Sequence, residues 1–357
     1  MPHYLCINDM VVTNGTELFE WRISEKLVCG NLEMPCCADD AMKYLHSASN
    51  EDQSEEIDSS EDHEDENEVT DEGTALNEGK CGYRKQQNTA TRIIDGDEAQ
   101  PNEYPWVVGI FFRLSSGNLR YIGGGSLIHE SVIMTAAHFL LQLTPEQLVI
   151  RAGEHDILDT TVDKKRQERN VTNIILHENL DANSLINDIA LIVLEKSFKL
   201  TEAVNTVCLP PQSVQTDKNV MCTTGGWGKN AADRHGKYQA KLKKVDLPIV
   251  ERGKCENLLR KTRLGPYYNL DNSLMCAGGG KRDTCKGDGG SPLFCKIPHD
   301  SERFYQTGIV AGGIGCGRKV PGMYVNVAHF TNWISQQLGF INLHLKPQNV
   351  LQYELFD

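Results

Sequence analysis

The sequence predicts an all-β protein that folds in an oxidising compartment, and two observations carry this prediction. Short apolar and β-branched segments alternate with glycine, proline and asparagine, as at Trp106–Phe112, Ser131–Thr135, Asp188–Leu194 and Gln306–Val310. Short strands separated by frequent turn signals are typical of a β-sandwich or a β-barrel. The chain also contains 12 cysteines in 357 residues, which favours disulfide formation outside the reducing cytosol.

The net charge of −13 has one local source. Residues 51–72 contain 13 Asp or Glu and no Lys or Arg, whereas the rest of the chain contains 36 acidic and 36 basic residues. A stretch of this composition repels itself and cannot bury enough apolar surface to fold. We expect a disordered linker that acts as a solvated spacer, with an electrostatic contact or metal chelation as the alternative. The nearly neutral remainder does not indicate a nucleic-acid partner.

The N-terminal residues carry no recognisable targeting signal. No apolar run approaches the ~20 residues of a membrane helix, and Met1–Met10 lacks the basic start and apolar core of a secretory signal. Because the cysteines still indicate an oxidising compartment, we expect a secreted protein whose sequence here starts downstream of its natural start. Two N-glycosylation sequons, Asn14-Gly-Thr and Asn170-Val-Thr, agree with secretion.

Three motifs follow one another in an order typical of one enzyme family: Thr135-Ala-Ala-His138, Asn187-Asp-Ile-Ala-Leu191 and Asp283-Thr-Cys-Lys-Gly-Asp-Gly-Gly-Ser-Pro-Leu293. They resemble the base loop, the aspartate strand and the nucleophile loop of trypsin-like serine proteases. The resemblance covers residues 93–338. It implies a trypsin-like fold of two six-stranded β-barrels, closed by a C-terminal helix at Val327–Leu338.

The resemblance assigns His138 as the general base, Asp188 as the carboxylate that orients it, and position 289 as the nucleophile. Position 289 is glycine, which has no side chain with which to attack a carbonyl. Ser291 lies two residues downstream, up to about 7 Å away at ~3.3–3.6 Å per residue, whereas hydrogen-bond reach to a base is about 2.6–3.2 Å. The resemblance therefore implies a protease fold without the protease reaction, although Gly287 and Gly289 keep the backbone N–H groups of an oxyanion hole.

The specificity pocket and the activation site are also similar to those of the family. Asp283 matches the acidic floor of a trypsin-type pocket, and Gly313 and Gly322 match its walls. Ala311-Gly312-Gly313 stands where the family has Ser-Trp-Gly, so that Gly312 removes an aromatic wall. We expect Asp283 either to bind a basic side chain of a partner or to be a relic.

Arg92-Ile93-Ile94-Asp95-Gly96 resembles the activation site. The resemblance implies that cleavage after Arg92 frees the α-amino group of Ile93. This group would pair with Asp288 and order the binding loops without producing activity. The alternative is that Arg92 is an exposed linker residue.

Four acidic residues resemble the calcium loop of trypsin-like domains: Glu154, Asp156, Asp163 and Glu168. Oxygen ligands at this density suit Ca²⁺, and a solvated acidic loop is the alternative. No organic cofactor is expected.

The cysteines divide the chain into regions. Residues 1–40 hold Cys6, Cys29, Cys36 and Cys37 and resemble the last two thirds of the six-cysteine clip domain of arthropod serine proteases. Four cysteines alone allow three pairings, and the resemblance implies Cys6–Cys37. Residues 41–92 form the acidic linker with the activation site, and residues 339–357 form a tail without an assigned role.

The resemblance pairs the other eight cysteines as Cys81–Cys208, Cys222–Cys295, Cys255–Cys276 and Cys285–Cys316. The family bridge beside the base is replaced by Gly123 and Phe139. We expect burial of Phe139 to take the place of that crosslink.

Further motifs, at Lys244–Val250, Leu259–Leu264 and Cys276–Gly279, closely resemble the insect clip-domain serine protease homologues. The resemblance implies a non-catalytic cofactor of prophenoloxidase activation, secreted into haemolymph and acting in melanisation and innate immunity. It implies cleavage by an upstream clip protease and association into homo-oligomers. The alternatives are a general recognition or adhesion module and an active trypsin-like endopeptidase, which would need a serine at position 289.

Overall fold

The computed structural model describes residues 20–21, 80–84, 97–159, 165–216, 220–230, 236–280, 283–346 and 349–356. Several predictions from the sequence lie outside these residues: the acidic linker at 51–72, the Cys6–Cys37 pair, Asn14, Arg92, Ile93 and Asp163.

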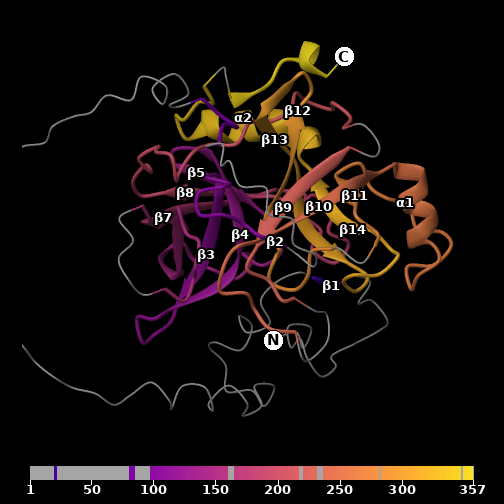
Figure 1. The fold of residues 1–357 in the computed structure, drawn as a ribbon, viewed down its shortest axis with the longest axis horizontal. Coiled ribbons are helices and arrows are strands. Elements are labelled where there is room, and N and C mark those ends of the chain that lie inside the picture. Colours follow the sequence, from indigo (N-terminus) through magenta and orange to yellow (C-terminus); the bar gives the residue numbers. More distant parts are fainter. Residues whose placement is uncertain are drawn as a thin grey trace, which may run out of the picture.

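The described chain forms two β-barrels that lie side by side (Figure 1). The first barrel is closed in the order β3-β4-β5-β8-β7-β6. Its strands are β3 (Val107–Arg113), β4 (Leu119–His129), β5 (Val132–Thr135), β6 (Leu148–Ala152), β7 (Gln167–Leu176) and β8 (Ala190–Leu194). Every pairing in it is antiparallel, and β3, β5 and β8 are the strands that the apolar segments predicted.

The second barrel runs in the order β13-β12-β9-β10-β11-β14 and closes through pairing of β13 with β14. Its strands are β9 (Met221–Gly226), β10 (Lys243–Val250), β11 (Leu274–Ala277), β12 (Pro292–Ile297), β13 (Asp300–Gly313) and β14 (Gly322–Asn326). The two-residue strands β1 (Glu20–Trp21) and β2 (Asp97–Glu98) add to β13 and β10. The prediction of two six-stranded barrels is therefore confirmed.

Within the residues that the structure describes, two α-helices and two short 3₁₀ helices accompany the barrels. The helix α1 (Arg252–Leu259) is capped by the Glu251 carboxylate, which accepts the N–H groups of Gly253 and Lys254. The helix α2 (Val327–Phe340) continues two residues beyond the predicted end. The 3₁₀ helices are η4 (Pro145–Gln147) and η6 (Tyr353–Leu355). In the described ranges, no helix is long and apolar enough to cross a membrane.

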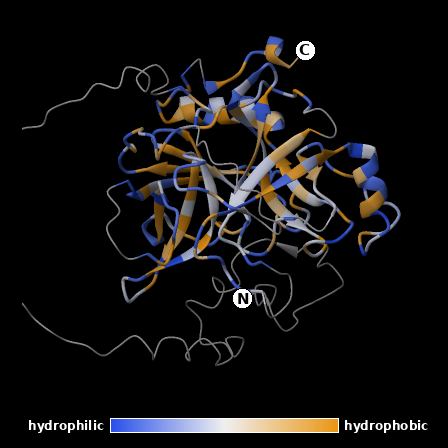
Figure 2. Cartoon of the chain, viewed as in Figure 1, coloured by the Kyte–Doolittle hydropathy of each residue, from blue (hydrophilic) through white to orange (hydrophobic). Residues whose placement is uncertain are grey.

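Aromatic side chains join the two barrels. Trp106, directly before β3, lies with its ring 5.2 Å from Phe294 of β12 and 5.6 Å from Phe304 of β13. Tyr104 adds a ring 4.8 Å from Phe294. All four side chains are buried. The strands of both barrels carry many apolar residues (Figure 2). Such ring pairs contribute ~0.5–1.5 kcal/mol each beyond area burial, so the two barrels form one packed unit.

The C-terminal tail packs against both barrels. The Leu209 N–H donates to the Asn349 carbonyl at 2.7 Å, and the Leu351 N–H donates to the Leu209 carbonyl at 2.9 Å. The Asn349 side-chain amide donates to the Ile128 carbonyl in β4, and the Phe356 ring lies 5.0 Å from Tyr305 in β13. The tail thus lies along the connection between the barrels.

Four disulfides crosslink the described chain: Cys81–Cys208, Cys222–Cys295, Cys255–Cys276 and Cys285–Cys316. These are the pairs that the family resemblance implies.

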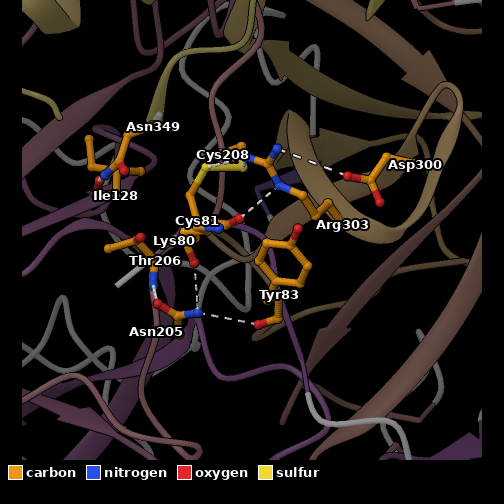
Figure 3. Close-up of a disulfide and its surroundings, with 10 residues drawn as sticks. All are labelled: Lys80, Cys81, Tyr83, Ile128, Asn205, Thr206, Cys208, Asp300, Arg303 and Asn349. Carbon is orange, nitrogen blue, oxygen red and sulfur yellow. Dashed lines mark hydrogen bonds and ion pairs between the residues drawn. A yellow bond between two sulfur atoms is a disulfide. The ribbon is translucent and has the colours of Figure 1, made fainter. Parts of the chain in front are cut away.

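The disulfide between Cys81 and Cys208 anchors the segment 80–84 (Figure 3). The Arg303 guanidinium donates to the Cys81 carbonyl and lies 5.3 Å from the Tyr83 ring. The Asn205 amide donates to the carbonyls of Lys80 and Tyr83. Covalent and polar contacts together therefore hold residues 80–84 against the barrels.

Candidate functional site

The predicted base and its orienting carboxylate are in contact at the end of the first barrel. The His138 Nδ1 lies 2.6 Å from the Asp188 Oδ2, and both side chains are fully buried. The Asp188 Oδ1 also accepts the backbone N–H groups of Ala137 and His138 at 2.9 and 2.7 Å. The carboxylate therefore fixes both the ring and the loop that carries it.

Asp188 itself lies before β8, which begins at Ala190. The apolar segment Asp188–Leu194 had predicted that it would lie inside the strand. Asn187 has a φ of 55°, and its N–H donates to the Ser273 hydroxyl. This left-handed residue turns the chain directly before the carboxylate. As a result, Asp188 can reach the base loop.

The loop that carries Gly289 is held against the first barrel. The Gly124 N–H in β4 donates to the Gly289 carbonyl at 2.9 Å, and the Gly290 N–H donates to the Val310 carbonyl at 2.9 Å. Gly290 has a φ of 82°, a conformation that suits glycine. The loop is thus fixed by main-chain contacts to both barrels, while residue 289 contributes no side chain.

Ser291 is fully buried. A Cβ built on Gly124 would overlap the Ser291 Oγ, and a Cβ built on Gly226 would lie 3.2 Å from it. The hydroxyl therefore fits into a space between β4 and β9 that two glycines leave open. In that position it is inaccessible to a substrate carbonyl.

Phe139 fills the space beside the base where the family has a disulfide. Its side chain is buried, and a Cβ built on Gly123 or Gly290 would lie 3.0 or 3.1 Å from its ring atoms. The ring lies edge-on to His138 at 5.6 Å between centroids. Phe139 thus connects the base loop, β4 and the Gly289 loop by packing.

Asp288 accepts backbone N–H groups in the uncut chain. Its Oδ1 accepts from Gly228 at 3.0 Å, and its Oδ2 accepts from Cys285 at 2.8 Å. A Cβ on Gly228 would lie 2.5 Å from the Asp288 Oδ1, so glycine is needed there. These bonds orient the carboxylate that the resemblance pairs with a new N-terminus at Ile93.

Tyr121 is a site residue that the sequence did not reveal. Its hydroxyl donates to the Gly287 carbonyl at 2.9 Å. Burial raises the pKa of the Tyr121 phenol, and the negative charge of Asp288 raises it further, so the hydroxyl stays protonated at neutral pH. Tyr121 therefore holds the peptide next to Asp288, although no motif marks it.

The predicted pocket residues lie on neighbouring elements of the second barrel. Gly312 of β13 pairs with Met323 of β14, which places Gly313 next to Gly322. The Asp283 carboxylate accepts the N–H of Thr284 at 2.8 Å and that of Gly317 at 3.3 Å. The described chain thus brings the expected floor and walls to one end of the barrel.

The described part of the predicted calcium loop forms ion pairs. The Glu154 Oε2 lies 3.6 Å from the Arg151 Nη1 and 3.5 Å from the Arg166 Nη1. The Glu168 Oε2 lies 2.9 Å from the Arg151 Nε. Two guanidinium groups among these carboxylates do not fit a bound divalent cation, which requires oxygen ligands.

Of the two remaining members of that predicted set, the structure describes only Asp156. The Asp156 Oδ1 accepts the Leu158 N–H at 3.0 Å, and Asp163 lies outside the described residues. Across the ranges that the structure describes, no three His, Cys, Asp or Glu side chains gather in a way that could hold a metal ion.

The predicted glycosylation residue Asn170 lies in β7 with an exposed side chain. Its Nδ2 donates to the Glu195 carboxylate at 3.0 Å, and its Oδ1 accepts from Arg113. Attachment of a glycan to Nδ2 would replace one of that nitrogen's two hydrogens.

Comparison with known proteins agrees with the geometry. The trypsin family matches residues 93–334. Phenoloxidase-activating factor 2 of Galleria mellonella is 42% identical over 273 residues, covering 72% of this chain and 89% of the relative. Two relatives from Anopheles gambiae, the inactive CLIP domain-containing serine proteases A8 and A28, are 34% identical over 344 residues and 38% identical over 248 residues. The match to A8 covers 94% of this chain and 86% of the relative. The match to A28 covers 67% of this chain and 62% of the relative. The buried His–Asp pair at the end of the first of two β-barrels and these relatives lead to one assignment: the chain belongs to the trypsin family, among the homologues of insect CLIP-domain serine proteases.

Proposed function

We propose that this protein is a secreted, non-catalytic cofactor of prophenoloxidase activation. The observation that carries the proposal is Gly289, which the resemblance assigns to the nucleophile position. His138, which Asp188 orients, supplies a base. Residue 289 has no hydroxyl from which this base could take a proton. Without a nucleophile, no acyl-enzyme can form.

The names of the relatives support the non-catalytic part of the proposal. Two of the relatives above are called inactive, and a third is called a phenoloxidase-activating factor. A protein that assists activation without cutting would act by binding. Since a fold does not determine a function, the step from these names to this chain requires a direct test.

The disulfides support the secreted part of the proposal. Four bridges join the described residues, and such bridges persist in oxidising compartments. Haemolymph is the proposed location because prophenoloxidase activation is the proposed task.

Cleavage after Arg92 by an upstream clip protease is the proposed trigger. A new N-terminus at Ile93 would compete for the Asp288 carboxylate, which accepts two backbone N–H groups in the uncut chain. Rearrangement of that loop would move Gly287 and its partner Tyr121. Homo-oligomers would then form on the rearranged surface.

Reconstitution tests the whole proposal. Cleaved protein, prophenoloxidase and its activating protease are mixed, and oxidase activity is measured with and without this chain. We expect activity to rise only when the cleaved chain is present. Arg92→Gln is the matched control, because it should resist cleavage and give no rise. Equal oxidase activity with and without the cleaved chain would favour a general recognition or adhesion role instead.

A serine-reactive phosphonate probe tests the absence of peptidase activity separately. Purified, cleaved protein should remain unlabelled, because position 289 has no hydroxyl and Ser291 is buried. An active trypsin, treated in parallel, confirms that the probe works. Stoichiometric labelling at Ser291 would instead show an active endopeptidase with a displaced nucleophile.

A further inference from the structure

One side of the helix α1 is fixed to the second barrel. Cys255 and Leu259, one helical turn apart, are buried, and the disulfide from Cys255 to Cys276 ties this side to β11. The helical hydrogen bonds continue past Leu259, since the Arg260 N–H donates to the Glu256 carbonyl at 2.8 Å. Figure 1 shows α1 on the outer side of the second barrel, away from the first. The opposite side of the helix therefore faces solvent.

That opposite side carries cations. Lys254 and Lys261 are seven residues apart, so at 3.6 residues per turn they lie about 20° apart around the helix axis. Both are exposed, as is Arg263 in the turn that follows. Within the described ranges, the ion pairs include neither Lys254 nor Lys261. Tyr267, close behind, is 96% exposed. We call Lys254, Lys261 and Arg263 the basic face.

Other groups of cations in the described chain have carboxylates of their own. Three buried or half-buried glutamates each lie within 4 Å of two cationic groups, which neutralises much of the charge around them. These are Glu98 with Lys241 and Lys243, Glu103 with Lys244 and Arg84, and Glu154 with Arg151 and Arg166. In contrast, residues 252–263 contain five Lys or Arg and one acidic residue. The basic face thus keeps its attraction for an anion.

The chain contains a segment of the opposite charge. Residues 51–72 hold 13 Asp or Glu and no Lys or Arg. Glu72 precedes Lys80 by eight residues, a reach of up to ~29 Å at ~3.6 Å per residue, and Glu51 can reach up to ~104 Å. A domain of about 260 residues has a radius of gyration of only about 18 Å. The acidic segment can therefore reach α1 from its anchor at Cys81.

We propose that the basic face of α1 is a docking surface for an acidic peptide segment, and that its occupant is residues 51–72 of the same chain. The contact ties the N-terminal region to the second barrel at a second place, besides the disulfide between Cys81 and Cys208. The acidic segment is then a ligand of the domain rather than a solvated spacer.

Tethering makes several weak ion pairs sufficient. Single exposed ion pairs contribute little, and at physiological salt they act over a Debye length of ~8 Å. A linked segment, however, acts at an effective concentration in the millimolar range. The disulfide at Cys81 keeps that concentration high even after cleavage at Arg92, because it holds the segment on the domain.

Zero-length crosslinking tests the contact in the wild-type full chain. A carbodiimide joins a carboxylate to an amine that touches it, and mass spectrometry identifies the pair. We expect residues 51–72 to be joined mainly to Lys254 and Lys261, at a yield that does not depend on protein concentration. The yield should fall in 1 M salt, where the Debye length is only ~3 Å. The exposed lysines Lys196, Lys199 and Lys237 are the internal comparison.

Peptide binding tests which cations are responsible. In a neutralised full chain, all 13 acidic residues of 51–72 are replaced by Asn or Gln. At low salt, a fluorescein-labelled peptide of residues 51–72 should bind this chain more tightly than wild type, whose own segment occupies the surface. Adding Lys254→Glu/Lys261→Glu/Arg263→Glu to the neutralised chain should weaken binding about tenfold or more.

The matched control reverses three exposed charges elsewhere in the neutralised chain. Lys196→Glu/Lys199→Glu/Lys237→Glu changes the net charge equally and should alter peptide binding by about twofold at most. An unchanged melting temperature shows that each variant is folded.

Three results would overturn the proposal. Equal loss of binding in both triple variants would mean that only net charge attracts the peptide. Crosslinks spread evenly over all exposed lysines would mean that the segment has no site. Crosslinks whose yield rises with protein concentration would assign the surface to a second copy of the chain. None of these measurements involves prophenoloxidase, so their failure leaves the proposed function untouched.

Discussion

Single residues around position 289 decide what this site can do. Gly289 contributes no side chain. Ser291 occupies a space that a Cβ on Gly124 would overlap, and a Cβ on Gly226 would lie 3.2 Å from its Oγ. Phe139 replaces a crosslink by packing against Gly123 and Gly290. The loop is thus well packed, and the absence of a hydroxyl at residue 289 underlies the proposed lack of peptidase activity.

Restoring that hydroxyl should not restore the enzyme. Gly289→Ser would supply a nucleophile near His138, but Ser291 and Gly312 still differ from the family pattern. A misplacement of 1 Å costs about 10²-fold in rate. We therefore expect cleavage of an arginyl chromogenic peptide by the cleaved single variant to be close to background.

The triple variant Gly289→Ser/Ser291→Gly/Gly312→Trp is the matched comparison and should cleave the same peptide faster than the single variant. Trypsin-like rates from Gly289→Ser alone would show that the cleft has kept its catalytic geometry. That result would weaken the argument that the domain works by binding.

Gly123→Ala tests the packing that replaces the crosslink. The new Cβ would lie 2.8 Å from the Gly289 carbonyl oxygen and 3.0 Å from the Phe139 ring. Overpacking of this kind costs about 1–3 kcal/mol, so we expect the free energy of unfolding to fall by that amount in chemical denaturation.

Gly339→Ala is the control for this substitution. Gly339 lies in α2, and a Cβ there would meet nothing within 4 Å. Its replacement should raise the free energy of unfolding by up to about 1 kcal/mol. If Gly123→Ala left the free energy of unfolding unchanged, the contact between Phe139 and β4 would be looser than the structure indicates.

At the scale of elements, the sequence predicted those strands and helices that a motif or an apolar pattern marks. The strands β3, β5 and β8 and the helix α2 were placed within a few residues, because apolar runs and helix periodicity are local signals. The His138–Asp188 contact could be predicted because three motifs stood in order. The pairing of β1 with β13 could not, since a two-residue strand has no periodicity and its partner is set by tertiary contacts. The role of Tyr121 could not be predicted either, because its hydroxyl acts by donating to a main-chain carbonyl and no motif marks it.

Glu103 connects three elements through charge, and this arrangement predicts a dependence of stability on pH. Its carboxylate lies 2.6 Å from the Lys244 Nζ in β10 and 3.1 Å from the Arg84 Nη1 in the disulfide-anchored segment. Burial opposes ionisation of Glu103, but hydrogen bonds from Lys244 and from the Gln100 N–H outweigh it. They hold the pKa of that carboxyl below its usual value.

A carboxyl whose pKa is lowered by folding stabilises the protein above its unfolded pKa, near 4.3, and loses this contribution as pH falls through the folded pKa. We therefore expect Glu103→Gln to lower the free energy of unfolding by about 1 kcal/mol at pH 7. The difference from wild type should shrink as pH falls below 4. Denaturant unfolding of both proteins at pH 7 and at pH 3 measures the difference in their free energy of unfolding. A difference that is independent of pH would contradict the ionic role of Glu103.

At the scale of the whole molecule, the disulfide at Cys81 joins the N-terminal region to both barrels. Its partner Cys208 lies in the connection between the barrels, and the segment 80–84 contacts Thr206 and Phe304 through main-chain hydrogen bonds. Limited proteolysis in the linker, favoured after Arg92, should therefore give two products that separate in gel electrophoresis only after reduction. Release of the N-terminal fragment without a reductant would show that the pairing differs.

The C-terminal tail gives the last prediction, because it lies over the same connection. Leu351 is buried and belongs to the same apolar cluster as Cys81, Cys208 and Tyr305, and its N–H donates to the Leu209 carbonyl. Leu→Ala at a buried site costs about 2–5 kcal/mol, with less where the surroundings can collapse. A tail near the chain end can collapse, so we expect Leu351→Ala to cost about 2–3 kcal/mol. In a domain of this size, that loss corresponds to a fall in Tm of roughly 4–12 °C. Glu354→Ala changes an exposed residue of the same tail and should stay within about 0.5 kcal/mol of wild type. Because the tail contacts both barrels, a single cooperative transition should shift as a whole in Leu351→Ala, whereas an unchanged midpoint would mean that the tail packs without stabilising the connection it covers.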